Sequence, residues 1–193
     1  QINFNKKFGI PKEKCIKTSL YFDGSKINKL QSSVSMGDYY ACIAQNRVEK
    51  GFQFLPDILD NCDDNINIIA VYYNEKQAKN AIDKYGFQPY IDNGILEIKF
   101  DIQWGTGLDE ILAKSRGIII PSIWPTTTEF GLLEALGLGK PVFTFDISVH
   151  HEEIINGING FKAPLGDYKT IANQLNLMNK DDKIYKLVSS GAK

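Results

Sequence analysis

The chain has 193 residues, of which 43% are hydrophobic and 23% are charged, and its formal net charge is −1. These values are ordinary for a globular protein that buries one sizeable core. A net charge near zero gives no basic field that would favour nucleic acid or an anionic membrane. Nearly all the positive charge is lysine, and the two arginines are Arg47 and Arg116.

Three cysteines, Cys15, Cys42 and Cys62, match no metal-binding or redox spacing. Their odd number favours free thiols in a reducing, cytoplasmic compartment. The chain opens on Gln1 and stops at Lys193 without a terminal motif. We therefore expect a piece of a longer cytoplasmic protein.

Residues 1–28 are the least regular part of the chain, and we expect a linker there that leads into one domain over residues 29–193. Apolar runs predict strands at 38–44, 66–73, 94–100, 117–121, 140–145 and 160–163. Helical patterns fall at 52–61, 75–85, 108–115, 127–138, 167–178 and 181–189, with a short helical turn at 152–155. Strand followed by helix, repeated about six times, predicts an α/β fold with a doubly wound, Rossmann-like sheet of about six mostly parallel strands.

Open parallel sheets bind ligands beyond the carboxyl ends of their strands, and two common motifs bind phosphate there. The dinucleotide fingerprint GxGxxG is absent, because Gly105-Thr106-Gly107 lacks the third glycine. The P-loop is also absent, because Lys140 is followed by Pro141 and opens a strand. Both absences count against NAD(P) enzymes and P-loop enzymes.

The segment over 121–142, PSIWPTTTEFGLLEALGLGKPV, offers a different phosphate site. A buried strand ends at Pro121, a polar loop follows, and a helix begins with Gly131 in its first turn. Free amides and the helix dipole favour an anion at such a start, and a glycine lets a ligand approach the backbone. Glu134 lies in an otherwise apolar helix, where a carboxylate needs partners such as ribose hydroxyls.

This segment resembles the signature of the C-terminal domain of group 1 (family 4) retaining glycosyltransferases of the GT-B fold, roughly PS-x-x-x-E-x-FG-L-x-x-x-EA-x-A-x-G-x-PV. A second block, EEIINGINGF over 152–161, is similar to that family's E-I-I-x-x-G-x-N-G-F. A third, Val48-Glu49-Lys50-Gly51, is similar to the end of its G-R-L-x-x-E-K-G. The three blocks occur in the family's order.

The resemblance implies one half of a GT-B enzyme, which binds a UDP- or GDP-sugar and transfers the sugar with retention, without metal or other cofactor. The other half would be an N-terminal acceptor-binding domain, so this fragment alone should be inactive; a peripheral membrane contact of the full-length enzyme is an option. Lys50 and Glu129 are the implied catalytic residues. The implied donor-binding residues are Gln45, Arg47, Thr126, Phe130, Gly131, Leu132, Leu133 and Glu134.

The sequence departs from the family pattern at the first glutamate of its E-x7-E motif. Without a gap this position falls on Thr126, whereas a gap in the loop assigns it to Glu129. A structural alternative is a capping box, in which the Thr126 hydroxyl and the Glu129 carboxylate bond each other's helix-end amides. Gln45 replaces the family's arginine, and Arg47 is a candidate substitute. These alternatives stay open at the level of sequence.

Other residues are given structural interpretations. Ser148-Val149 replaces a family Gly-Gly at the sugar end, so donor preference is expected to differ. His150 and His151 lack a nucleophile or metal-ligand pattern and are expected on the surface or in a loop. Trp104 and Trp124 are expected to pack, with Trp124 also able to border the ligand.

Two rival functions remain at this stage. One is a non-catalytic nucleotide-sugar-binding module, and the other is an enzyme that resembles glycogen synthase or phosphorylase.

Overall fold

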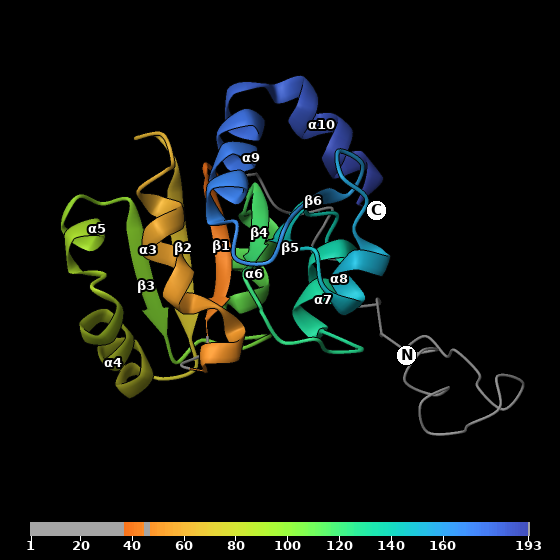
Figure 1. Cartoon of the computed structure of the whole chain (residues 1–193). Coiled ribbons are helices and arrows are strands. Elements are labelled where there is room, and N and C mark those ends of the chain that lie inside the picture. The colour runs from red at the N-terminus through yellow and green to blue at the C-terminus, as the bar shows by residue number, and fades with distance from the viewer. Residues whose placement is uncertain (1–36, 45–46, 193) are drawn as a thin grey trace, which may run out of the picture.

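A computed structural model describes residues 37–44 and 47–192 (Figure 1). Within these residues six strands form one parallel sheet: β1 (Tyr39–Ala44), β2 (Asn67–Tyr72), β3 (Leu96–Phe100), β4 (Gly117–Ile120), β5 (Val142–Phe145) and β6 (Gly160–Ala163). Their order is β3-β2-β1-β4-β5-β6. From β1 the chain adds β2 and β3 toward one edge, then crosses back to β4 and adds β5 and β6 toward the other edge. This order confirms the doubly wound fold. The predicted linker over 1–28 lies outside the described residues.

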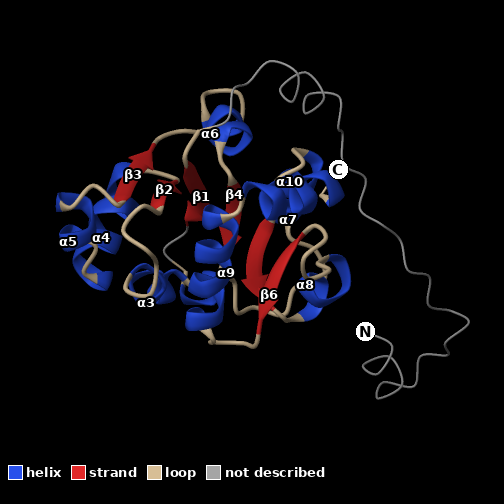
Figure 2. Cartoon of the chain, turned by 90° about the horizontal axis from the view of Figure 1, so that it is seen from above, coloured by secondary structure: helices blue, strands red, loops and turns tan. Residues whose placement is uncertain are grey.

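Helices connect the strands and cover both faces of the sheet (Figure 2). They are α3 (Leu55–Leu59), α4 (Glu75–Tyr85), α5 (Gln88–Asp92), α6 (Leu108–Lys114), α7 (Phe130–Gly137), α8 (Ser148–Glu153), α9 (Tyr168–Lys180) and α10 (Asp182–Gly191), with the 3-10 turns η2 (Val48–Lys50) and η3 (Phe52–Phe54). The larger core lies beneath α3, α4, α5, α9 and α10, and the smaller one beneath α6 and α7. No described helix combines the length and the apolar character that a membrane span requires.

The strand sequences explain this two-sided burial. Successive side chains of a strand point to opposite faces, so Tyr40 and Cys42 enter the larger core while Ala41 enters the smaller one. Every residue of β4 and β5 is buried. A strand covered on both faces needs a nearly continuous apolar sequence, which is the pattern that predicted these strands.

Most predicted bounds agree with the structure within two residues, but three helical segments differ further and one helix was not predicted. The helix expected at 52–61 is divided into η3 and α3, because Pro56 lies in the first turn of α3, where it is favoured at a helix start. The turn expected at 152–155 is wrong, since α8 ends at Glu153 and Ile154 is extended and buried. The helix expected from residue 127 begins at Phe130, and α5 was not predicted.

Candidate functional site

The central strands β1 and β4 lie side by side, and from them the chain proceeds to opposite edges of the sheet. Such a reversal of strand order is where open α/β sheets bind ligands. The loops that follow the two strands are bonded together: the Glu49 carbonyl accepts the Ile123 amide at 2.9 Å and the Ser122 hydroxyl at 3.3 Å. A pocket of about 280 Å³ opens at this point. Its lining is Ile43, Lys50, Leu108, Ile119, Ile120, Thr128, Glu129, Phe130, Gly131 and Glu134.

Gly51 allows the loop after β1 to reach this pocket. Its φ of 76° lies in the left-handed region, and a Cβ added there would be 1.7 Å from the carbonyl oxygen of Pro121. Only a residue without a side chain can pack its backbone so closely against the end of β4. The glycine of the Glu-Lys-Gly block therefore positions the neighbouring Lys50 at the pocket.

Lys50 and Glu129 form an ion pair inside the pocket, with Nζ 2.8 Å from Oε1. The Lys50 side chain is 25% exposed and that of Glu129 is 10% exposed. The other oxygen of Glu129 lies 3.0 Å from Nε2 of His150. Burial raises the pKa of Glu129, but the hydrogen bonds and charges of His150 and Lys50 outweigh burial and lower it overall. Glu129 is thus held as a carboxylate.

Glu134, five residues further along α7, has the opposite environment. Within residues 37–44 and 47–192 no hydrogen bond or ion pair engages its carboxylate. Burial raises the pKa of Glu134 above its ordinary value, because no donor compensates for the lost water. A carboxylate that lines a pocket without a partner is suited to accept hydrogen bonds from a ligand.

The start of α7 supplies free backbone donors. The Glu129 carbonyl accepts the amides of Leu132 at 3.1 Å and Leu133 at 3.3 Å. The amides of Phe130 and Gly131 have no acceptor among the described residues, as expected for the first turn of a helix. These two amides lie at the positive end of the helix dipole and next to the Lys50–Glu129 pair, so the site combines a cation with donors for an anion.

Comparisons with known proteins were made for the whole chain. No protein-family model matches it, and no curated protein matches it. Its fold does match solved structures. Anabaena Alr3699/HepE in complex with UDP and glucose superposes with a TM-score of 0.68 at 19% identity, over 90% of this chain and 47% of that one. WaaG, a glycosyltransferase involved in lipopolysaccharide biosynthesis, superposes with a TM-score of 0.70 at 13% identity, over 99% and 54%.

A third structure, sucrose-phosphate synthase from Thermosynechococcus elongatus, superposes with a TM-score of 0.70 at 13% identity, over 87% of this chain and 42% of that one. These neighbours are GT-B glycosyltransferases. The chain has the fold of a GT-B domain. The chain spans about half the length of the solved structures it matches.

The fold brings some of the predicted donor-binding residues together at the pocket and leaves others out of its lining. Lys50, Glu129, Phe130, Gly131 and Glu134 line the pocket. Leu132, Leu133 and Arg47 do not appear in the pocket lining, and their roles as donor-binding residues stay predictions. Leu132 is fully buried and packs in the smaller core. Gln45 lies outside the described residues.

The geometry at the start of α7 bears on the alternatives that the sequence leaves open. The capping box is wrong: the residue that caps α7 is Glu129, and no side chain in the described part of the chain bonds the first amides of the helix. The Thr126 hydroxyl bonds Thr128 instead, accepting its amide at 3.2 Å and donating to its carbonyl at 2.6 Å. This local turn keeps the backbone out of helix until Phe130. Glu129 therefore reaches the pocket and Thr126 does not.

Two expectations about large side chains are corrected, and two are confirmed. His150 is fully buried, contrary to the expected surface or loop position, whereas His151 is on the surface as expected. Trp104 packs against the smaller core as expected, but Trp124 is 59% exposed and does not pack. His150 was missed because its two partners, Glu129 and Thr144, come from elsewhere in the chain. A polar threonine inside the apolar run KPVFTF was the signal available.

The EEIINGINGF block shapes the turn into β6. The Asn159 side chain accepts the Ile155 amide at 2.8 Å and donates to the Glu153 carbonyl at 2.8 Å. Gly160 packs against the backbone of β5, since a Cβ there would lie 2.3 Å from the Val142 oxygen. This part of the family signature is therefore explained by local structure.

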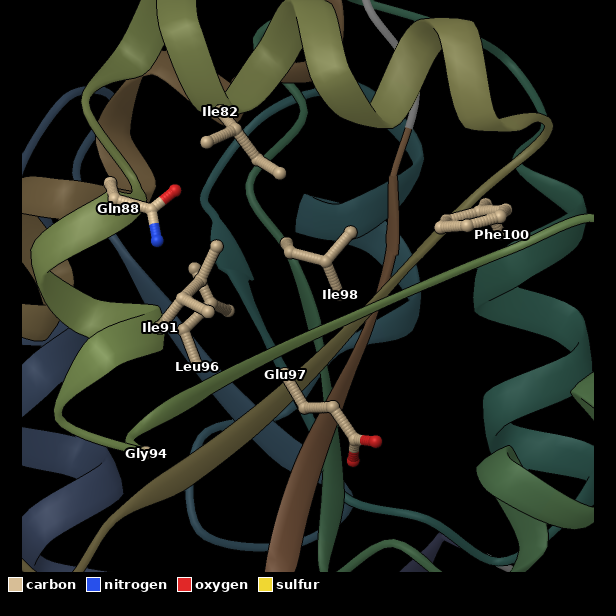
Figure 3. Close-up of a pocket in the computed structure, with 8 residues that line it drawn as sticks. All are labelled: Ile82, Gln88, Ile91, Gly94, Leu96, Glu97, Ile98 and Phe100. Atoms are coloured by element: carbon tan, nitrogen blue, oxygen red, sulfur yellow. The ribbon is translucent and has the colours of Figure 1, made fainter.

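A larger cavity of about 530 Å³ lies at the outer strand β3, beneath α4 and α5 (Figure 3). Its lining is mainly apolar, and includes Ile82, Ile91, Leu96 and Ile98. Its charged lining residue, Glu97, bonds Lys99 and points away from the isoleucines (Figure 3). The cavity lacks a cation to neutralise a phosphate, so the pocket at the sheet centre remains the candidate site.

Proposed function

We propose that this chain is the donor-binding domain of a retaining glycosyltransferase that uses a UDP- or GDP-sugar. The observation that carries the proposal is the convergence of the Lys50 ammonium, the free amides of Phe130 and Gly131, and the unpartnered Glu134 carboxylate in one pocket at the reversal of strand order. The ammonium and the free amides suit a diphosphate, and the carboxylate suits the two hydroxyls of a pentose. The HepE complexes with UDP and with UDP-glucose support this choice of ligand.

In the proposed mechanism the protein stabilises the leaving group. Breaking the bond between the sugar and the diphosphate leaves negative charge on the phosphate oxygens. Lys50 and the amides at the start of α7 would stabilise that charge, and donors fixed before the reaction cost no reorganisation. Lys50 can turn from Glu129 to a phosphate because its side chain is partly exposed.

Glu134 would anchor the ribose and so fix the position of the reacting carbon. Glu129 lies beside Lys50, where its carboxylate can accept a hydroxyl of the donor sugar once Lys50 has turned to the phosphate. As in the family whose motifs the chain resembles, we expect retention of configuration and no requirement for a metal. A cytoplasmic location likewise stays a prediction from the cysteine content.

A second, acceptor-binding domain is part of the proposal. Large apolar side chains are exposed along the carboxyl edge of the sheet, where a cleft between two domains would form. They include Val48, Tyr73, Trp124, Phe130 and Leu165, each between 55% and 63% exposed. An apolar rim around a binding site is typical of a surface that another protein surface covers. The 193-residue chain alone is therefore expected to bind donor but to turn it over poorly.

The test is binding of nucleotides to the 193-residue chain, followed by thermal shift and calorimetry with UDP, GDP, ADP and their sugars. At a ligand concentration one hundred times Kd, binding stabilises a protein by about 2.7 kcal/mol. Lys50→Ala and Glu134→Ala should each weaken binding. Lys79→Ala is the matched control, because Lys79 also lies 2.8 Å from a glutamate but is 71% exposed and far from the pocket.

Absence of any shift with millimolar nucleotide, or binding that Lys50→Ala leaves unchanged, would contradict the proposed site. A full-length protein that binds donor but releases no UDP or GDP in the presence of acceptors would indicate a non-catalytic module. A phosphorylase would instead show the absorbance of a pyridoxal cofactor.

A further inference from the structure

His150 is a buried polar side chain beside the pocket whose two ring nitrogens both have partners, and the proposed mechanism does not use it. It lies in the first turn of α8 and is 0% exposed. Its Nδ1 is 2.7 Å from the Thr144 hydroxyl and its Nε2 is 3.0 Å from Glu129 Oε2. A buried imidazole with both nitrogens bonded has one fixed orientation, so its partners are fixed as well.

The hydrogen bonds define which atoms carry protons. The Thr144 hydroxyl has one proton and donates it to the Ile120 carbonyl at 2.7 Å. Its oxygen also lies 2.7 Å from Nδ1 of His150, which fixes that side of the ring. Glu129 is a carboxylate and can only accept, so Nε2 must donate to it.

The chain of contacts continues outward into the pocket. His150 holds Oε2 of Glu129, and Oε1 of the same carboxylate holds Nζ of Lys50. Lys50 has a long side chain that loses considerable rotamer freedom when it is fixed. The Glu129 carboxylate can hold the ammonium in place only if the carboxylate is itself fixed. Thr144 in β5 fixes the ring of His150, and the ring fixes the carboxylate.

We propose that His150 is a positioning residue of the donor site, which holds the Glu129 carboxylate through Nε2 and thereby places the Lys50 ammonium for the diphosphate. This inference rests on the proposed function. When Lys50 turns to the phosphate, Oε2 stays bonded to His150 and the carboxylate stays out of the phosphate position. Without the Nε2 donor the carboxylate is free to move with Lys50 and to repel the anion.

Two substitutions separate the two ring nitrogens. His150→Gln places an amide near the position of Nε2 and can still donate to Glu129. His150→Asn places its amide near Nδ1 and leaves Glu129 without that donor. Both variants shorten or reshape the same buried side chain, so a purely structural role would affect both alike.

The experiment measures the Kd of UDP for the 193-residue chain by calorimetry. We expect His150→Asn to weaken binding about tenfold, the change that follows loss of one charge-assisted hydrogen bond. We expect His150→Gln to retain most of the affinity. The surface variant His151→Gln, the matched control, should bind as the parent chain does. Equal affinity loss in His150→Asn and His150→Gln would overturn the inference.

The outcomes distinguish the inference from the function on which it rests. If Lys50→Ala abolishes UDP binding while His150→Asn leaves it unchanged, the inference fails and the proposed function stands. If Lys50→Ala has no effect, the proposed function fails. Nitrogen-15 NMR of the unsubstituted chain gives a second measurement that does not depend on folding of the variants. A proton on Nε2 supports the inference, and an unprotonated Nε2 facing Glu129 overturns it.

Discussion

Replacing Glu129 by alanine removes the acceptor that lies between a buried imidazole and a half-buried ammonium. His150 then keeps a ring nitrogen that neither protein nor bulk water satisfies, because the ring is fully buried. Leaving such a group unpaired costs about 1–3 kcal/mol. Lys50 is 25% exposed and can recover water, so its share is below about 1 kcal/mol. Together these contributions predict a loss of about 1–4 kcal/mol in the free energy of unfolding, which overlaps the range for breaking a buried pair.

Urea unfolding of the 193-residue chain measures this loss. With a slope of about 2 kcal/mol per molar urea, the midpoint should fall by about 0.5–2 M and the slope should stay constant. The control is Glu75→Ala, because Glu75 also lies 2.8 Å from a lysine but is 53% exposed. Its effect should stay below about 0.5 kcal/mol. A Glu129→Ala effect no larger than that of the control would refute the argument that Glu129 is the centre of a buried network.

Three further predictions concern the same region. Gly51→Ala should lower the free energy of unfolding, measured in urea, by more than about 3 kcal/mol. The added Cβ would clash with the Pro121 carbonyl, and alanine is strained in the left-handed backbone conformation of this position. A loss below about 1 kcal/mol would contradict the close packing. Glu134→Gln should raise thermal stability at neutral pH, by on the order of 1 kcal/mol, because the folded state raises the pKa of this carboxyl. The gain should disappear as the pH falls through the raised pKa of Glu134 toward the ordinary glutamate value, because the carboxyl of the parent protein is then protonated and burial no longer penalises it. A gain that persists in acid would count against burial as its cause. Arg47→Ala should change the free energy of unfolding by less than about 0.5 kcal/mol, because the Arg47 side chain is 67% exposed and its partner is the nearby Glu49. A larger loss in urea unfolding would show that this surface ion pair contributes to stability.

Most of the fold was predictable because its determinants are local. The runs INIIAVYY and GIIIP are apolar on both faces, which a strand covered by helices on both sides requires. Asn74 begins α4, where its side chain accepts the Gln77 amide at 2.9 Å, and Gly86 ends the helix in the left-handed backbone conformation that glycine favours. Each of these signals needs only a few neighbouring residues.

The site was predictable only in part, because some of its contacts join distant residues. Lys50 and Glu134 belong to blocks of recognisable sequence. Glu129 bonds Lys50, which is 79 residues away, and His150, which is 21 residues away. These contacts depend on how segments that are distant in the sequence meet in the fold. The capping-box prediction failed for the same reason: the local pattern was correct, but the ion pair and the turn at Thr126 outweighed it.

The two glutamates of the pocket show why the site needs a fixed ion pair. The described lining carries one ammonium and two carboxylates, so it has no excess of positive charge with which to attract a diphosphate. Glu129 already neutralises Lys50 in the empty pocket, and Glu134 adds a charge that burial disfavours. Attraction must then come from the backbone amides at the start of α7, and from Lys50 once it leaves a carboxylate that His150 keeps in place. A site with this charge balance should bind the diphosphate weakly on its own and more tightly when a second domain closes over it, because exclusion of water strengthens each remaining interaction.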